Sequence, residues 1–240
     1  MQAVVLAGGQ GTRLRSLVSN VPKPMAPVSG RPFLEHLLDY WITQGVDRAI
    51  LSVGYMRDLI KNHFGHRYRG CGIEYADEEM PLGTGGAVLN CLPHLDHDSP
   101  ALVLNGDTFF SVELKRLREF HQKQGAEVTL SLFESDDTAR YSGVSLTPEW
   151  TIREFSSATP PDSLCLVNGG VFYFSGSTLA RLKLLPLRKS SLESDLISGL
   201  IQEGTKVCGF LSPAPFIDIG TPEDYLRAPA ILTNQLLGDS

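Results

Sequence analysis

The sequence predicts an α/β fold, one domain with a Rossmann-like, doubly wound sheet that is mostly parallel but mixed. Short apolar segments alternate with amphipathic helical segments over about the first 130 residues, a pattern typical of parallel strands joined by crossover helices. After Asp136 the apolar segments shorten and are separated by clusters of Pro, Ser and Thr, which indicates a second lobe. No internal repeat or long linker divides the 240 residues, so a single domain over residues 1–240 is expected.

The segments 32–44 and 1–7 show how individual elements are predicted. In 32–44, apolar side chains recur at i, i+3 and i+4, with Pro32 at the start and Gly45 just past the end, so an amphipathic helix is expected. The segment 1–7 is short and nearly all apolar, as buried parallel strands are. The same criteria predict strands at 49–53, 72–76, 101–104, 128–133, 143–146, 152–155, 167–174, 206–211 and 216–219, and helices at 56–64, 84–91, 113–124, 177–185 and 192–203. The strands at 206–211 and 216–219 are expected to complete the sheet.

Composition and charge are those of a globular protein and argue against two kinds of partner. Hydrophobic residues make up 42% of the chain and charged residues 20%, with a net charge of −6. Because no basic run offsets this charge, no nucleic-acid surface is expected. No segment approaches the ~20 apolar residues that span a bilayer, and the first strand leaves no space for a signal peptide. Free thiols and a cytoplasmic location are expected from the scattered cysteines Cys71, Cys91, Cys165 and Cys208.

A glycine-rich loop directly follows the first strand. Glycines lack a Cβ atom, so backbone N–H groups can approach an anion, and Thr12 and Arg13 add a hydroxyl and a guanidinium suited to phosphate. Lys23 follows between two prolines that stiffen the backbone. The loop is neither a Walker A motif nor a dinucleotide fingerprint, and a turn that only links strand to helix is the structural alternative. We expect a nucleoside triphosphate to contact Leu6, Ala7, Gly8, Gly9, Gly11, Thr12 and Arg13.

The string GGQGTRL at 8–14, followed by PKPM at 22–25, resembles the signature of the sugar-1-phosphate nucleotidylyltransferase family. The resemblance extends from residue 1 to about Tyr225, nearly the whole chain. It implies the nucleotide-diphospho-sugar transferase fold, with a nucleotide-binding half at 1–135 and a sugar-binding lobe at 136–228. It also implies an enzyme that transfers a nucleoside monophosphate to a sugar 1-phosphate and releases pyrophosphate, with Arg13 and Lys23 as catalytic residues.

Two aspartates stand at the ends of predicted strands. Asp107 follows the strand at 101–104, and Asp218 lies near the end of the strand at 216–219. The carboxyl ends of strands form the usual ligand crevice of an open α/β sheet, although aspartate is also favoured in turns for its bonds to the backbone. The resemblance implies that these two carboxylates hold a Mg²⁺ cofactor, an ion that proteins bind through oxygen atoms, waters and substrate phosphates.

A second glycine-rich turn, PLGTGGA at 81–87, resembles the segment that lies against the nucleobase in this family. There, glycines permit close approach and backbone groups contact the edge of the base. The form LGTGGA is most similar to that of family members that use GTP, so GTP is the favoured nucleotide. Further nucleotide contacts are therefore expected from Leu82, Gly83, Thr84, Asn105 and Gly106.

The resemblance also implies a set of sugar-binding residues in the second lobe. Asn168 offers an amide suited to hydroxyl groups, and glycines beside it permit close approach. Glu193 matches a sugar-side glutamate, although a carboxylate in the first turn of a helix has a structural explanation too. Many relatives place a lysine against the sugar phosphate where this chain has Ser157 and Ala158, and Arg140 is a candidate replacement. The expected sugar contacts are Gly143, Asn168, Gly169 and Glu193.

Among the activities that the resemblance implies, it favours GMP transfer from GTP to D-glycero-α-D-manno-heptose 1-phosphate, for the synthesis of surface polysaccharides. The alternatives are mannose 1-phosphate with GTP, or another hexose 1-phosphate with UTP or dTTP. A non-catalytic nucleotide-sensing subunit would be expected to lack Arg13, Lys23, Asp107 or Asp218, and a metal-free sugar-binding module would not need the loop at 8–14. The sequence leaves the oligomeric state open, and a homo-oligomer is possible.

Overall fold

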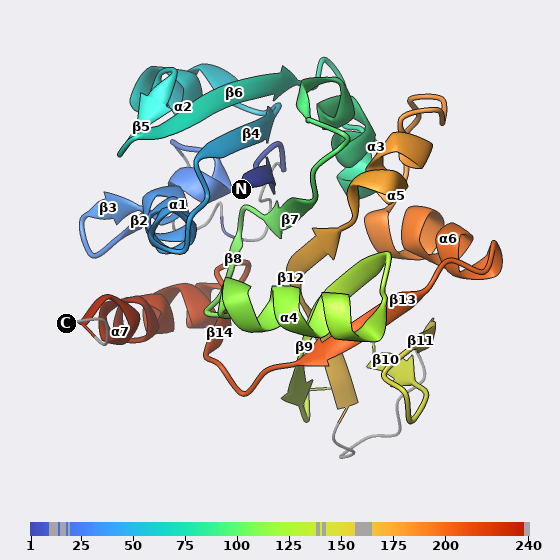
Figure 1. Ribbon diagram of the computed structural model, residues 1–240. Helices are drawn as coiled ribbons and strands as arrows, with labels where there is room; N and C mark the ends of the chain where they lie inside the picture. The colour runs from blue at the N-terminus through green and yellow to red at the C-terminus, as the bar shows by residue number, and fades with distance from the viewer. Residues whose placement is uncertain are drawn as a thin grey trace.

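The structure of the protein, a computed structural model, describes residues 1–9, 14, 18, 20–137, 140, 143–156 and 165–237, without the side chains of 156 and 233–237. In these residues a 10-stranded sheet has the order β11-β10-β12-β7-β1-β4-β6-β5, and β9 and β13 attach to it through β12 (Figure 1). The predicted α/β fold with a mixed sheet is confirmed, and the structure forms a single domain.

Four parallel strands form the part of the sheet that carries the glycine-rich loop. β1 lies between β7 and β4 and pairs with both along its whole length. Alternate side chains of β1 enter two different cores, Ala3 and Val5 on one face and Val4 on the other, as expected for a strand covered on both faces. The four strands run in one direction, so their carboxyl ends meet at one edge of the sheet: β1 (Gln2–Leu6), β4 (Arg48–Val53), β6 (Cys71–Asp77) and β7 (Ala101–Asn105).

An antiparallel strand joins this parallel part to the rest of the sheet. β12 (Cys165–Phe174) pairs with β7 through its last four residues and with β9 on its other side. The register with β9 shifts between Asn168 and Phe172, which marks a bulge at the predicted sugar-binding segment. The remaining strands on this side are β9 (Val128–Ser135), β10 (Gly143–Leu146), β11 (Ile152–Ser156) and β13 (Val207–Leu211).

The prediction that the segment 216–219 completes the main sheet is wrong. β14 (Phe216–Asp218) pairs antiparallel with β8 (Thr108–Phe110), and the two form a separate sheet. Tertiary contacts of Phe216 accompany this pairing, because its ring meets Phe110 of β8 edge-on at 5.9 Å between centroids and stacks on Phe133 of β9 at 4.1 Å. The two-residue strands β2 (Pro27–Val28), β3 (Arg31–Pro32) and β5 (Arg67–Tyr68) are too short for their pattern to be recognised.

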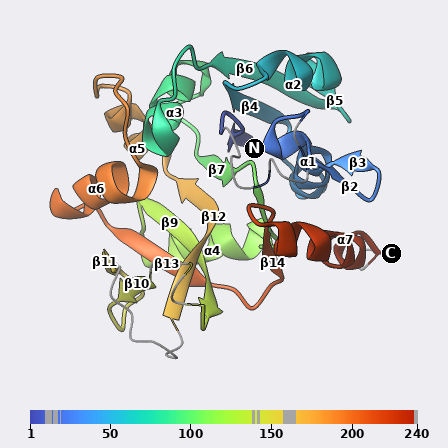
Figure 2. The same cartoon turned by 180° about the vertical axis from the view of Figure 1, so that it is seen from behind.

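Helices cover both faces of the sheet (Figures 1 and 2). The larger apolar core includes the fully buried Phe33 and Trp41, and the smaller core lies on the opposite face. The predicted helix at 192–203 is a π-helical turn, η3, followed by α6. The larger core is packed by α1 (Phe33–Thr43), α2 (Arg57–Phe64), α4 (Leu114–Gln124) and α7 (Pro222–Leu237), and the smaller by α3 (Gly83–Cys91), α5 (Gly176–Leu182), η3 (Leu192–Ile197) and α6 (Ser198–Gln202).

The four cysteines are buried and carry free thiols. Within the described ranges, none of the helices combines the length and apolar character required to cross a membrane.

The segments 92–94 and 23–25 are single 3-10 turns, η2 (Leu92–His94) and η1 (Lys23–Met25), and the second of them carries Lys23.

A buried histidine connects α4 to the sheet. His121 is 6% exposed, and its ring nitrogens lie 2.8 Å from the hydroxyl of Thr129 and 3.0 Å from that of Ser175. A neutral imidazole has one donor and one acceptor, which two hydroxyl groups can satisfy. Burial disfavours the charged ring and lowers the pKa of His121 from 6.5 to about 4.

Acidification should therefore destabilise the protein through His121. The unfolded chain binds a proton at this residue near pH 6.5 and the folded chain only near pH 4. The stability contributed by the neutral ring is complete above pH 6.5 and is lost as pH falls towards 4, by up to about 3 kcal/mol. Urea unfolding at pH 7 and pH 4.5 should show a smaller loss for His121→Gln than for the wild type. Equal losses would assign the acid sensitivity to other groups.

Candidate active site

The loops at the carboxyl edge of β1 and β7 are held in direct contact. The backbone N–H of Gly106 donates to the carbonyl of Leu6 at 3.0 Å. A Cβ atom at residue 106 would lie 2.6 Å from that carbonyl oxygen, so a glycine is required for this close approach. Asp107 follows at once, which places its carboxylate beside the start of the glycine-rich loop.

Lys23 lies between the two predicted metal-binding aspartates. Its Nζ is 2.6 Å from Oδ2 of Asp107 and 3.1 Å from Oδ1 of Asp218. The aspartates meet because β8 and β14 pair in a register that sets Asp218 opposite Thr108, and the N–H of Ile219 donates to the carbonyl of Asp107 at 3.1 Å. The side chain of Lys23 is 11% exposed, so its charge lies in a site where solvent screens it only partly. The three residues that were predicted to act together are therefore adjacent.

Arg140 extends this cluster from the second lobe. Its guanidinium donates to Oδ2 of Asp218 at 3.0 Å and also pairs with Asp224, a buried residue in the first turn of α7. The N–H of Gly220 donates to Asp218 at 2.7 Å. Burial alone would raise the pKa of the Asp218 carboxyl, but Lys23 and Arg140 outweigh it and hold this pKa below its ordinary value. Asp218 is therefore a stable carboxylate.

The paired carboxylates suit a Mg²⁺ ion that also binds substrate. In the part of the chain that the structure describes, no group of three or more His, Cys, Asp or Glu side chains is placed to hold a metal. Mg²⁺, however, is commonly bound by one or two carboxylates together with waters and substrate phosphates. Asp107 and Asp218 supply two such groups around one cationic atom, so their donor set fits the ion.

A cavity of about 340 Å³ opens beside Asp107. It lies between the end of β1, the end of β7 and the start of α3, the position of ligand crevices in open α/β sheets. The residues predicted to contact nucleotide and found in its lining are Leu6, Gly8, Gly9, Gly83, Thr84 and Asn105. Gly11, Thr12 and Arg13 lie outside the described residues, as do Ser157 and Ala158 on the sugar side.

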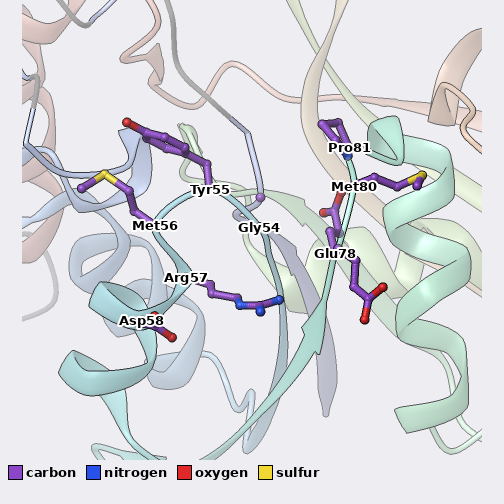
Figure 3. Close-up of a pocket in the computed structure, with 10 residues that line it drawn as sticks. Gly54, Tyr55, Met56, Arg57, Asp58, Glu78, Met80 and Pro81 are labelled. Atoms are coloured by element: carbon purple, nitrogen blue, oxygen red, sulfur yellow. The ribbon is translucent and has the colours of Figure 1, made fainter.

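Glu78 is a lining residue that the sequence analysis missed. It borders the first cavity and also a second one of about 560 Å³, shown in Figure 3, where it stands with Met80 and Pro81 across from Tyr55 and Arg57. Its carboxylate accepts from the hydroxyl of Ser52 at 2.8 Å and from the N–H of Leu82 at 3.1 Å. A carboxylate directly after a buried strand and four residues before a glycine turn was the available signal.

On the sugar side, Asn168 and Glu193 form a pair. The amide of Asn168 donates to Glu193 at 2.5 Å, and its carbonyl oxygen accepts from the N–H of Gly170 at 3.1 Å. Gly169 packs against the ring of Phe110, next to the strand that follows Asp107. Gly143, in the neighbouring strand β10, pairs with Val167 of β12. Three of the predicted sugar-binding residues therefore lie on β10 and β12, and Glu193 reaches Asn168 from η3. Their contacts with a sugar stay a prediction.

The family model for nucleotidyl transferases matches residues 2–235. The chain therefore belongs to the nucleotidyl transferase family, and the predicted family resemblance is confirmed. Its relatives include enzymes that are named for the transfer of guanylyl groups to sugar phosphates.

The D-glycero-alpha-D-manno-heptose 1-phosphate guanylyltransferase of Aneurinibacillus thermoaerophilus is 39% identical over 228 residues, which cover 95% of this chain and 96% of that protein. The mannose-1-phosphate guanylyltransferase of Mycobacterium tuberculosis is 36% identical over 97% of this chain, but the match covers only 64% of that protein. The crystal structure of HddC from Yersinia pseudotuberculosis complexed with GMP-PN superposes with a TM-score of 0.81 at 32% identity, covering 95% of this chain and 98% of that one.

Proposed function

We propose that this protein transfers GMP from GTP to D-glycero-α-D-manno-heptose 1-phosphate and releases pyrophosphate. The observation that carries the proposal is the placement of Lys23 between Asp107 and Asp218, beside the 340 Å³ cavity. The relative that shares 39% identity over 95% of the chain supports the choice of substrates. The product, a GDP-activated heptose, has the chemistry of a donor for the synthesis of a surface glycan.

The reaction exchanges one phosphorus–oxygen bond for another. An oxygen of the sugar phosphate forms a bond to the α-phosphorus of GTP, and the bond from this phosphorus to the leaving pyrophosphate breaks. Charge spreads over the phosphoryl oxygens, so positioning and electrostatic stabilisation supply most of the catalysis and no covalent enzyme intermediate is required. Lys23 holds the α-phosphate, and Arg13 with the amides of the glycine-rich loop holds the β- and γ-phosphates.

Mg²⁺ would be held by Asp107 and Asp218, and when bound it neutralises phosphate charge. The role of this chain is to keep the two carboxylates ionised and oriented. The pairing of Arg140 with both Asp218 and Asp224 fixes the orientation of Asp218 from the second lobe. Arg140 also brings positive charge to the aspartate pair, where the phosphate of the sugar arrives, which supports its assignment as the replacement for the missing lysine.

Glu78 accounts for the choice of guanine in this proposal. Guanine presents a ring N–H and an amino group on one edge, both hydrogen-bond donors, and a carboxylate accepts from both. Each oxygen of Glu78 already accepts one bond, from Ser52 or Leu82, and keeps a further acceptor position. These two bonds hold the carboxylate at the boundary between the two cavities.

Glu78→Gln should shift the nucleotide preference. The amide presents a donor where guanine also donates, so kcat/KM for GTP should fall about 10- to 100-fold, while the low activity with ATP should change little. Glu79→Gln, which removes a neighbouring carboxylate of the 560 Å³ cavity, is the matched control. Equal losses with both nucleotides would instead assign Glu78 a structural role in holding Leu82.

Mannose 1-phosphate is the second candidate acceptor, favoured by the relative from Mycobacterium tuberculosis at 36% identity. Pyrophosphate release should be measured with GTP, ATP, UTP and dTTP against heptose, mannose and glucose 1-phosphates. Release with GTP and heptose 1-phosphate well above every other pair is expected. Release that is highest with mannose 1-phosphate would replace the acceptor, and no release with any pair would refute the proposal.

A further inference from the structure

One side of the glycine turn at the start of α3 packs against another segment of the chain, residues 188–191. Cβ atoms added at Gly83, Gly85 or Gly86 would lie 2.5–2.7 Å from backbone oxygens of the segment 188–191. The N–H groups of Gly85 and Gly86 donate to the carbonyl of Ser190 at 2.9 and 3.3 Å. These glycines therefore allow close packing against a segment about 100 residues later in the chain, and one of them, Gly83, also lines the nucleotide cavity.

Thr84 makes the side-chain contact between these two segments. Its Oγ1 accepts from the N–H of Leu192 at 2.9 Å. Leu192 is the first residue of η3, and the N–H groups in the first turn of a helix have no partner within the helix. Thr84 thus satisfies the first N–H of η3 in the other lobe, and it is also one of the residues that line the 340 Å³ cavity.

The residue after Leu192 is Glu193, the partner of Asn168. The carbonyl of Glu193 accepts from the hydroxyl of Ser198 at 2.9 Å, so the backbone here is held from both ends. On the other side, Asn168 accepts from Gly170, which packs closely against the side chain of Asn105 in the strand before Asp107. A chain of contacts therefore leads from the nucleotide cavity to the Asn168–Glu193 pair.

We infer that Thr84 is a positioning residue for the sugar phosphate, which acts by setting Glu193 and Asn168 against the nucleotide cavity. The inference rests on the proposed function and goes beyond it, because sequence resemblance gave Thr84 a role with the nucleotide. Loss of its hydroxyl leaves the N–H of Leu192 without this partner and frees the start of η3 to move. The sugar phosphate, not GTP, then loses its preformed contacts.

The test compares Thr84→Val with Thr84→Ser in the full chain, using GTP and D-glycero-α-D-manno-heptose 1-phosphate. Valine keeps the shape and removes the acceptor, so KM for the sugar phosphate should rise about tenfold while KM for GTP stays within twofold. Serine restores the acceptor and should return KM for the sugar phosphate to near the wild-type value. Thr43→Val removes a hydroxyl that bonds to Tyr40 on α1, far along the chain from the cavity, and should leave both KM values unchanged.

A second pair of variants tests the packing of the glycine turn against the segment 188–191 independently of Thr84. Gly86→Ala places a Cβ atom against the backbone oxygen of Arg188 and should also raise KM for the sugar phosphate. Gly199→Ala adds the same atom to α6 where no atom lies within 4 Å, and serves as control. A rise in KM for GTP with an unchanged sugar KM would overturn the inference, as would Thr84→Val kinetics equal to wild type. A wild-type protein that releases no pyrophosphate under any conditions would overturn the proposed function with it.

Discussion

Lys23→Ala should lower kcat for pyrophosphate release by about 100- to 1,000-fold, the range observed when one preorganised group that stabilises developing charge is removed. Lys23 is mostly buried, and its Nζ lies 2.6 and 3.1 Å from two carboxylates. Both features hold its charge at one point with little screening, and alanine removes this charge from between the two carboxylates. The measurement is single-turnover and steady-state pyrophosphate release at saturating GTP and sugar phosphate.

The control for Lys23→Ala is Lys61→Ala. Lys61 also pairs with a carboxylate, Asp77, at 2.7 Å, but the pair is on the exposed side of α2. Alanine there removes a surface ion pair that contributes about 0–1 kcal/mol, and kcat should not change. If the Lys23→Ala protein is folded by circular dichroism and its kcat is within threefold of the wild-type value, Lys23 has no role in the mechanism.

The position of Asp107 could be predicted from local pattern, whereas its meeting with Lys23 was expected from the family resemblance. The apolar run of β7 and its end at Asn105 place Asp107 at the carboxyl edge of a parallel sheet, and the glycine-rich loop leaves the same edge from β1. The position of Asp218 depends on pairing between two segments far apart in the chain. It lies on a three-residue strand that the sequence pattern predicts, but the pattern does not show that this strand pairs with β8, about 108 residues earlier in the chain.

Contacts between segments far apart in the sequence could not be predicted for the same reason. The glycines at 83–86 suggest close approach by some group, and the sequence does not tell a nucleobase from the backbone of residues 188–191. Likewise, nothing in the sequence indicates that Arg140 pairs with Asp218 and Asp224. Both are tertiary contacts between segments that are distant in the sequence. The local pattern of each segment is explained by its own helix, strand or turn, so only the folded chain shows the contacts.

Asp107→Asn and Asp218→Asn should each lower kcat by at least about 100-fold and raise the Mg²⁺ concentration that gives half-maximal activity. An amide is uncharged and a weaker ligand for a hard cation, and the loss of charge stabilisation at a metal site amounts to several kcal/mol. A chelator should abolish wild-type activity, and added Mg²⁺ should restore it. Asp77→Asn, at the exposed pair with Lys61, is the matched control and should leave the Mg²⁺ dependence unchanged.

The two substitutions should differ in their effect on stability, and this difference tests the geometry. The side chain of Asp107 is 39% exposed and pairs with Lys23, whereas Asp218 is 22% exposed and binds Lys23, Arg140 and the N–H of Gly220. Asparagine at 218 weakens the contact that fixes Arg140 and should reduce the free energy of unfolding by about 1–2 kcal/mol, while asparagine at 107 should reduce it by less. If both variants kept wild-type Mg²⁺ dependence, the metal would have to bind elsewhere. If only Asp107→Asn lost activity, Asp218 would not be a metal ligand, because an ion held by both carboxylates requires both of them.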